Sequence, residues 1–330
     1  MTLPENIHPF SKLDPSYVAD AVESCGYVTD GRIFALNSYE NRVYQIGIED
    51  SEPLIGKFYR PNRWTQAQIQ EEHDFSFELC EDELPVVAPL TNNDKESIFQ
   101  YGDFLFSLFP RKGGRAPELD NPDNLVVLGR FLARIHNVGA AKPFLHRPEI
   151  TPQNYGHESV AYVSANFIPA ELQIAYDTLT KDLLAYIDQV FAESHNIARI
   201  RVHGDCHIGN MLWRDDAPHF IDFDDCRTAP TIQDLFMLLS GPREEQRSQL
   251  IEIIDGYQEF GDFDKKELRL IESLRTLRML HFSAWLARRW DDPAFPMGFP
   301  WFNTARYWEE HILSLREQLA ELHEPTIEII

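Results

Sequence analysis

The chain has 330 residues, of which 43% are hydrophobic and 12% aromatic, and it carries a formal net charge of -23 at pH 7. This length predicts two domains or one large domain, and the composition excludes a wholly disordered protein. An acidic surface repels nucleic-acid phosphates and anionic lipids, so we expect neither a nucleic-acid partner nor a membrane partner. The sequence has no apolar run long enough to span a membrane, no basic and apolar leader, and no C-x-x-C pair. These features favour a cytoplasmic protein with reduced thiols.

The first part of the chain predicts a short helix followed by an antiparallel sheet. Asp14 and Pro15 precede residues 16–24 as a capping side chain and a proline at the first helical position. β-Branched and aromatic residues then cluster in three segments typical of strands, at residues 32–37, 42–48 and 53–59. The turn after the first segment contains Ser38 but lacks the glycines of a dinucleotide or Walker phosphate loop. The residues alone leave an ordinary hairpin turn as open as a nucleotide contact.

A lysine in the third strand segment and the helix expected after it form the next pattern. Lys57 lies within residues 53–59, and residues 65–80 combine an apolar face with acidic positions. In protein kinases a lysine at this place contacts the ATP phosphates and is held by a glutamate of the following helix. Without further context, an exposed edge lysine and a surface charge pair explain the same residues.

Two or three more strands are predicted before a connector that we take as the lobe boundary. The strand segments are residues 86–90, 97–100 and 103–109. The connector at residues 111–115 is basic and contains two glycines. We therefore expect an N-terminal lobe at residues 1–109 and a C-terminal lobe at residues 110–330.

The C-terminal lobe is expected to be mainly helical, because its apolar residues recur every three or four positions. The predicted helices start at Pro122 and Thr231 or cover residues 169–191, 244–260, 265–290 and 304–323. Arginines and tryptophans concentrate in the fifth of these, at Arg275, Arg278, Trp285, Arg288, Arg289 and Trp290. A substrate surface and interior packing of paired arginines both explain this stretch, and we favour interior packing.

The most informative stretch of the sequence is residues 202–227, which read V-H-G-D-C-H-I-G-N-M-L-W-R-D-D-A-P-H-F-I-D-F-D-D-C-R. Asp205 is followed five positions later by Asn210 and, after a predicted hairpin, by Asp222. This is the spacing of a kinase catalytic loop, in which the first Asp accepts the proton of the substrate hydroxyl while the Asn and the later Asp hold magnesium. The alternative is a turn followed by a solvated acidic loop, and the match at all three positions disfavours it.

These motifs resemble those of a known family. The block H-G-D-x-H-x-G-N at residues 203–210, followed by I-D-F-D-D at residues 221–225, is similar to the aminoglycoside phosphotransferase and choline kinase branch of the protein-kinase-like fold. More narrowly, the chain resembles the bacterial stress response kinase A family. This resemblance is carried by residues 37–44, 57–61 and 285–296. The resemblance covers nearly the whole chain and implies an α+β, two-lobed protein-kinase-like fold with a small antiparallel sheet in one lobe.

The resemblance also implies roles for single residues. Asp205 is expected to be the catalytic base, and Asp222 a catalytic residue that binds Mg²⁺ together with Asn210. Ser38 in the first turn is expected to contact ATP, and Lys57 to contact the ATP phosphates. Glu72, with Glu71 as the alternative, is expected to hold Lys57. The main chains of Ser107 and Phe109 are expected to bind the adenine.

We therefore expect a monomeric, ATP- and Mg²⁺-dependent phosphotransferase. The resemblance favours a serine or threonine of a protein as the acceptor and a role in a cellular stress response. The catalytic block fits a small-molecule kinase of the aminoglycoside, choline or homoserine type equally well. A nucleotide-binding scaffold without catalysis is disfavoured, because the base and both metal-binding positions are filled.

The expected catalytic loop also differs from that of eukaryotic protein kinases. Gly204 stands where many of them carry an arginine that pairs with a phosphorylated activation loop. Only a few residues separate Asp222 from Pro230, which leaves no room for a long regulatory loop. We therefore expect activity without phosphorylation of this segment.

Overall fold

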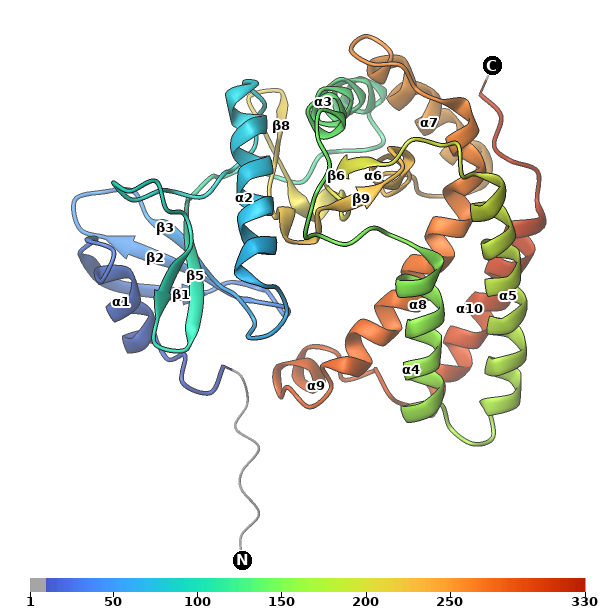
Figure 1. The fold of residues 1–330 in the computed structure, drawn as a ribbon, viewed down its shortest axis with the longest axis horizontal. Coiled ribbons are helices and arrows are strands. Elements are labelled where there is room, and N and C mark those ends of the chain that lie inside the picture. The colour runs from blue at the N-terminus through green and yellow to red at the C-terminus, as the bar shows by residue number, and fades with distance from the viewer. Residues whose placement is uncertain (1–9, 330) are drawn as a thin grey trace, which may run out of the picture. The chain divides into compact units, whose positions relative to one another are not determined.

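The computed structural model describes residues 10–329, whose contacts form two compact units. The first unit comprises the described residues up to Pro117, together with Phe144–Arg147 and Ile208–Cys226. The second comprises Glu118–Pro143, Pro148–His207 and the described residues from Arg227 onward. The first contains a small antiparallel sheet and the second is mainly helical, so the predicted α+β class is confirmed (Figure 1). The lobe boundary at residue 110 stays a prediction, and the expectation that residues 1–9 hold no leader lies outside the described residues.

The first unit is built on a five-stranded antiparallel sheet with the order β1-β2-β3-β5-β4. Its strands are β1 (Thr29–Ala35), β2 (Arg42–Ile48), β3 (Leu54–Phe58), β4 (Phe99–Tyr101) and β5 (Phe104–Pro110). The register of β3 and β5 places Lys57 opposite Ser107 and Ile55 opposite Phe109. The central strands therefore carry several of the residues that the sequence singled out.

Two helices pack in the first unit, each with a capping side chain at its start. Helix α1 (Pro15–Glu23) begins as predicted, since the Asp14 side chain accepts a hydrogen bond from the N–H of Tyr17. Helix α2 (Gln66–Glu81) begins with a capping box, in which Thr65 and Gln68 exchange side-chain to main-chain hydrogen bonds. The buried side of α1 joins the core on one face of the sheet.

A hairpin of β7 (Met211–Arg214) and β8 (Ala217–Phe220) also belongs to the first unit. Asp215 and Asp216 at its tip both have positive φ angles, 53° and 57°, as a two-residue type I′ turn requires. The strand predicted at residues 86–90 is wrong. Pro85 and Pro89 supply no N–H donors for a ladder, and only an isolated bridge forms, where the N–H of Val87 donates to the carbonyl of Phe220.

The second unit consists of helices around a short two-stranded sheet. Its helices are α3 (Pro122–Ala140), α4 (Glu158–Asn166), α5 (Gln173–Glu193), α6 (Ile232–Phe236), α7 (Arg243–Tyr257), α8 (Ile271–Arg288), α9 (Ala294–Gly298) and α10 (Ala305–His323). Its strands are β6 (Ile200–Val202) and β9 (Arg227–Ala229). The short elements α4, α9 and β9 were not predicted. The helix predicted at residues 265–290 is instead a 3-10 segment, Lys265–Leu270, followed by α8.

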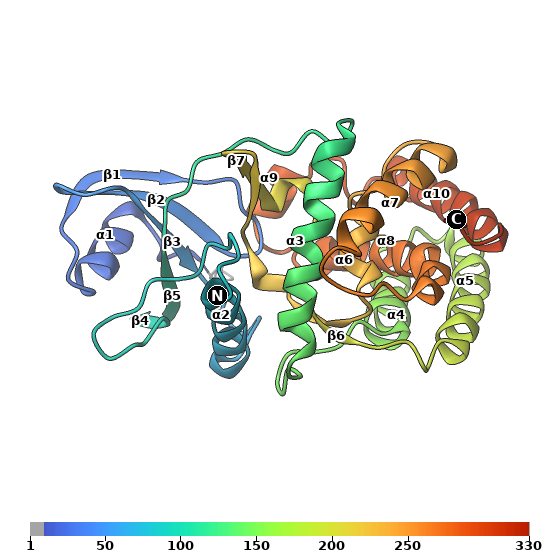
Figure 2. The ribbon, with the colours of Figure 1, turned by 90° about the horizontal axis from the view of Figure 1, so that it is seen from above.

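Helices α3 and α7 pack closely side by side (Figures 1 and 2). A Cβ atom on Gly129 of α3 would lie 2.0 Å from the carbonyl oxygen of Ile253, and a Cβ on Gly256 of α7 would lie 2.0 Å from that of Val126. Each helix thus needs a glycine where the backbone of the other passes. Among the helices of residues 10–329, none is both long and apolar enough to cross a membrane.

Candidate active site

Lys57 is buried among three carboxylates in the first unit. Its Nζ lies 2.9 Å from Asp222 Oδ1, 3.2 Å from Asp224 Oδ1 and 3.5 Å from Glu72 Oε1. Strand β3 carries the lysine, α2 carries the glutamate, and the two aspartates follow β8. Burial favours the neutral amine, but the surrounding carboxylates outweigh this effect and raise the pKa of Lys57 well above its ordinary value. The lysine therefore stays a fixed positive charge.

Glu72 and Glu71 have different partners. The carboxylate of Glu72 lies between Lys57 and Arg147, whose Nη1 is 3.7 Å from Glu72 Oε2. Burial raises the pKa of Glu72 to about 7, against the opposing effects of Lys57 and Arg147. Glu71 instead accepts main-chain hydrogen bonds, at 2.9 Å from the N–H of His146 and 2.8 Å from that of Arg147. Of the two glutamates, Glu72 is therefore the one in the lysine cluster.

Arg147 ties α2 to the segment that carries the aspartates. Its guanidinium donates to the carbonyl of Gln68 in α2 and to the carbonyls of Asp224 and Cys226. The side chain is buried, and its guanidinium also lies 4.4 Å from the ring centroid of Trp64. No spacing in the sequence pointed to Arg147, because its partners are mostly main-chain carbonyls distant along the chain.

A cavity of about 380 Å³ opens beside the lysine cluster, and all its lining residues belong to the first unit. Apolar side chains such as Val43, Ile55 and Leu212 form part of its wall. The predicted residues that line it are Ser38, Lys57, Glu72, Phe109, Asn210 and Asp222. An apolar wall next to a charged end suits a ligand with a flat ring and an anionic tail.

Of the predicted nucleotide contacts, Ser38 lines the cavity and Ser107 does not. Ser38 lines the cavity and its Oγ donates to the carbonyl of Asn41, which closes the turn between β1 and β2. The side chain of Ser107 is fully buried, donates to the carbonyl of Ser97 and does not line the cavity. Phe109 does line it. Main-chain contacts of Ser107 and Phe109 with adenine stay predictions.

Asn210 and Asp222 provide the oxygen atoms that Mg²⁺ prefers. Both line the cavity, and the Asp222 side chain is 52% exposed. Asp222 has a left-handed backbone, with φ of 59°, a conformation that is strained for a residue with a side chain and is often found at functional positions. No group of three or more His, Cys, Asp or Glu side chains within residues 10–329 is arranged to hold a metal.

Asp205 belongs to the second unit, in the loop after β6. Its carboxylate lies 2.7 Å from Arg278 Nη1 of α8 and 3.4 Å from His207 Nε2. The structure thus brings most of the predicted nucleotide and metal residues together at one cavity of the first unit and places the predicted base beside Arg278 in the second.

The main chain of this loop is held by Asp234 at the start of α6. Asp234 accepts hydrogen bonds of 2.9 Å from the N–H of His203 and 2.8 Å from that of Gly204. His136 lies 3.0 Å from the same buried carboxylate. Asp234 and His136 are both buried, and these hydrogen bonds fix the main chain of the loop from which Asp205 projects.

The arginine- and tryptophan-rich stretch of α8 is not interior as a whole. Arg288 is exposed, and the side chain of Arg278 is 41% exposed. The arginines are paired, as expected: Arg278 with Asp205, and Arg289 with the carbonyl of Trp285. Interior packing was the wrong interpretation for Arg278 and Arg288, and the pair of Arg278 with Asp205 was missed, since no local pattern links residues so far apart.

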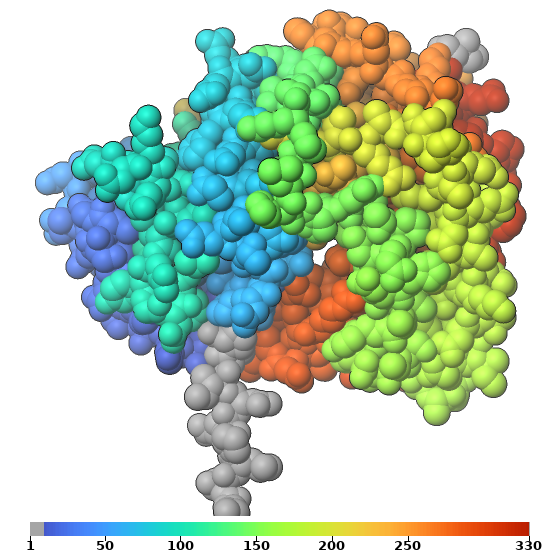
Figure 3. Space-filling view, viewed as in Figure 1, coloured from blue at the N-terminus to red at the C-terminus, as the bar shows by residue number. Residues whose placement is uncertain are grey.

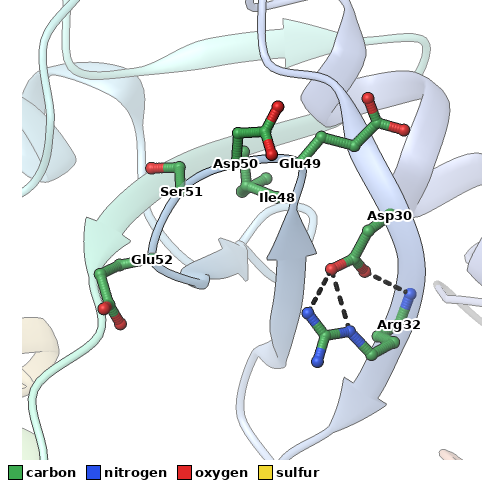
Figure 4. Close-up of a pocket in the computed structure, with 7 residues that line it drawn as sticks. All are labelled: Asp30, Arg32, Ile48, Glu49, Asp50, Ser51 and Glu52. Atoms are coloured by element: carbon green, nitrogen blue, oxygen red, sulfur yellow. Dashed lines mark hydrogen bonds and ion pairs between the residues drawn. The ribbon is translucent and has the colours of Figure 1, made fainter.

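A second hollow, of about 660 Å³, lies beside Asp30, Arg32 and residues 48–52 (Figure 4). Arg32 pairs with Asp30, and the remaining lining includes the acidic residues Glu49, Asp50 and Glu52. None of the predicted site residues lines it. Its negative charges would repel a phosphate, so it is a poor candidate despite its size.

Comparison with known proteins agrees with this geometry. A family model described as "Phosphotransferase enzyme family" matches residues 33–271. The chain belongs to this family. Within it, the chain is 43% identical over 326 residues to "Serine/threonine protein kinase RdoA" of Salmonella typhimurium (strain LT2), with 98% of each chain covered. It is 44% identical over 321 residues to "Stress response kinase A" of Escherichia coli (strain K12), with 97% of each covered. These relatives place it in the stress response kinase A family, as the motifs predicted, and establish it as a kinase.

Solved phosphotransferase structures share the fold. An amicoumacin kinase in complex with AMP-PNP and Ca²⁺ is similar with a TM-score of 0.69 and 19% identity, covering 90% of each chain. A microcompartment-associated aminopropanol kinase is similar with a TM-score of 0.70 and 18% identity, covering 93% of this chain and 96% of the other. At this identity the likeness concerns the fold, and it confirms the protein-kinase-like class.

Proposed function

We propose that this kinase transfers the γ-phosphoryl group of ATP, with Mg²⁺, to serine or threonine hydroxyls of proteins in a cellular stress response. The observation that carries the proposal is the buried Lys57 beside Glu72 and Asp222 at the charged end of a cavity of about 380 Å³. The names of the relatives, a serine/threonine protein kinase and stress response kinases, support the choice of acceptor and the cellular role. That the enzyme is monomeric and cytoplasmic stays a prediction.

In this proposal the first unit binds the nucleotide. The Lys57 ammonium contacts the α- and β-phosphates, and Glu72 and Arg147 fix the position of that lysine. Asn210 and Asp222 hold Mg²⁺, which neutralises charge on the phosphates when bound. Val43, Ile55 and the other apolar residues of the wall exclude water from the base.

Asp205 is the general base of the proposed reaction. It takes the proton from the serine or threonine hydroxyl as the oxygen bonds to the γ-phosphorus, while the bond from that phosphorus to the β–γ bridging oxygen breaks and ADP leaves. The neighbouring cation Arg278, at 2.7 Å, fixes the position of the carboxylate before the acceptor arrives. Asp234 holds the loop in place through the N–H groups of His203 and Gly204.

We further propose that the kinase is active without phosphorylation between Asp222 and Pro230. Helix α2 is held to this segment by Arg147, which donates to the carbonyls of Asp224 and Cys226. Glu71 holds the same helix to the main chain of His146 and Arg147. In many protein kinases a phosphorylated loop controls the position of this helix. A phosphosite within residues 222–230 that is required for activity would refute this part of the proposal.

The test is transfer of labelled γ-phosphate from Mg-ATP to a generic basic protein and, in parallel, to aminoglycosides, choline, homoserine and other amino alcohols. Asp205→Asn serves as the control. Label on protein serine or threonine that is absent with Asp205→Asn supports the proposal. Label on a small molecule alone would leave a kinase but overturn the acceptor class. An unchanged cellular effect with Asp205→Asn would point to a non-catalytic scaffold.

A further inference from the structure

One face of α8 leads from the predicted base to a set of aromatic side chains. Arg278, His281, Phe282 and Trp285 lie at positions i, i+3, i+4 and i+7, so they lie on one side of the helix. All four are partly or fully exposed, whereas Leu277, Leu280 and Ala284 are buried. The face therefore stays accessible in the folded unit.

The N-terminal end of this face touches the reaction site that we propose. The guanidinium of Arg278 lies 2.7 Å from Asp205 Oδ1, within the second unit. A hydroxyl group that approaches Asp205 therefore lies next to Arg278. The rest of the chain that bears this hydroxyl can then extend along α8.

The other end of the face continues into an aromatic surface, formed by Phe282, Trp285, Phe299 and Trp301. The ring of Phe282 stacks on Trp285 with centroids 5.8 Å apart, and Trp285 and Phe299 meet edge to face at the same distance. Phe299 meets Trp301 at 5.8 Å. Phe282 is 43% exposed and Trp301 is 45% exposed. Atoms of the segment that follows α8 are visible at the surface (Figure 3, orange-red). Contiguous exposed aromatic side chains are a common mark of a binding surface.

The charges around this surface disfavour a cationic small molecule. A quaternary ammonium would bind over an aromatic face, but the guanidinium of Arg289 lies 5.4 Å from the ring centroid of Trp285. Arg278 is paired with Asp205, so the guanidinium that bears on the aromatic side chains is that of Arg289. A cationic acceptor such as choline would compete with Arg289 for the ring of Trp285, whereas a neutral apolar side chain would not be repelled there.

The length of this face determines how far the phosphorylated residue of an acceptor lies from the side chain that contacts the aromatic surface. Phe282 and Trp285 lie four and seven residues beyond Arg278, or roughly 6–10 Å along a helix that rises about 1.5 Å per residue. An extended peptide covers this length with about two to three residues at ~3.3 Å each. We propose that the acceptor is a polypeptide segment bound along α8, with an aromatic or large apolar residue about two to three positions from the phosphorylated serine or threonine. This inference rests on the proposed protein-kinase function and names its recognition element.

The experiment uses the full chain and a set of otherwise identical peptides with one serine and one phenylalanine. The phenylalanine is placed in turn at each position on either side of the serine, and a reference peptide has alanine instead. For wild type we expect kcat/KM to rise about 10-fold when phenylalanine lies two to three positions from serine on one side, because burial of an aromatic side chain against the surface contributes to binding.

The ratio of kcat/KM for the best phenylalanine peptide to that for the alanine peptide is then measured in variants. We expect the ratio to fall to near one with Trp301→Ala and Phe282→Ala. It should keep its wild-type value with Phe260→Ala, an equally exposed phenylalanine (50%) of the second unit outside the surface. Because each ratio compares two peptides on the same protein sample, a partly unfolded variant does not distort it.

Two results would overturn the inference while leaving the proposed function intact: peptide phosphorylation that does not depend on the position of phenylalanine, or a ratio that Trp301→Ala and Phe282→Ala leave unchanged. Phosphorylation of amino alcohols or aminoglycosides with no transfer to any peptide or protein would instead overturn the protein-kinase function, and this inference with it.

Discussion

Replacing Glu72 with glutamine should affect catalysis and the stability of the fold in opposite directions. The substitution keeps the shape of the side chain but removes its charge, which lies 3.5 Å from Lys57 and 3.7 Å from Arg147. Lys57 keeps two carboxylates, Asp222 and Asp224. In the proposed function, Asp222 is also the carboxylate that binds Mg²⁺, so the lysine loses the one partner outside the metal-binding segment.

The pKa of Glu72 determines the effect on stability. Burial raises this pKa from 4.5 to about 7, so the ionised side chain destabilises the fold at alkaline pH by about 3 kcal/mol relative to the protonated one. The contribution of Glu72 is therefore most favourable below pH 4.5 and is lost as the pH rises through about 7. Glutamine does not ionise, so we expect Glu72→Gln to be at least as stable as wild type at pH 8.

Activity should change in the opposite direction. At 3.5 Å and an effective dielectric constant of about 20, the gross attraction between Lys57 and Glu72 is about 5 kcal/mol. If roughly half of this holds the lysine at the phosphates, kcat/KM falls about 100-fold. The assay is transfer of labelled phosphate at pH 8 together with urea unfolding of the same samples. Wild-type activity should also decline as the pH falls below about 7, where Glu72 becomes protonated, and the variant should lack this step.

Glu71→Gln is the matched control on the neighbouring position. Its remaining side-chain oxygen can still accept the hydrogen bonds from the N–H groups of His146 and Arg147, while that from Leu145 is lost, so we expect less than a tenfold change in kcat/KM. Parallel losses of activity and stability in Glu72→Gln, or equal activity losses in the two variants, would refute the assignment of Glu72 as the charged partner of Lys57.

Three further predictions concern the metal, the helix packing and acid stability. Asp222→Asn should raise the Mg²⁺ concentration for half-maximal transfer at least about 10-fold, measured by metal titration after chelation, and an unchanged requirement would argue against Asp222 as a ligand. Gly129→Ala should lower the free energy of unfolding by about 2–3 kcal/mol, because its Cβ would lie 2.0 Å from the carbonyl oxygen of Ile253; Gly113→Ala, whose Cβ meets nothing within 4 Å, is the control in urea unfolding. Burial lowers the pKa of His311 from 6.5 to about 4, so its contribution to stability is complete above pH 6.5 and declines by up to about 3 kcal/mol as the pH falls towards 4. In urea unfolding, the free energy of unfolding should therefore decline less between pH 7 and pH 4 for His311→Gln than for wild type. An equal decline in both proteins would contradict the lowered pKa of His311.

Residues within local motifs could be predicted well from the sequence. Asp222 and Asn210 sit at the ends of a hairpin whose turn residues are recognisable, and the structure places both at one cavity. Glu72 was preferred to Glu71 because its spacing to Phe75 and Leu79 resembles the pattern of the family, and the structure places Glu72 in the lysine cluster. These positions lie within a single helix or a single hairpin, where sequence patterns are most informative.

The features that the sequence did not predict depend on contacts between distant segments. Arg147 acts mainly through main-chain carbonyls, which leave no trace in the sequence. Arg278 and Asp205 are paired only because α8 passes the loop after β6 in the second unit. The extended segment at residues 86–90 has the composition of a strand, yet Pro85 and Pro89 reduce it to a single bridge. Long-range pairing and missing donors therefore account for most of these differences.

The anchoring of α2 also bears on how the kinase could be inhibited. Many kinases exchange between a competent form and one in which this helix is displaced, and ligands can select the displaced population. Here displacement would strip Arg147 of its contact with Gln68 and leave Glu71 without the N–H groups of His146 and Arg147. A conformer that breaks several of these polar contacts at once has a low population, and a ligand that requires it loses affinity in proportion. Compounds that fit the cavity beside Lys57 in its resting shape should therefore bind better than compounds that require the helix to move.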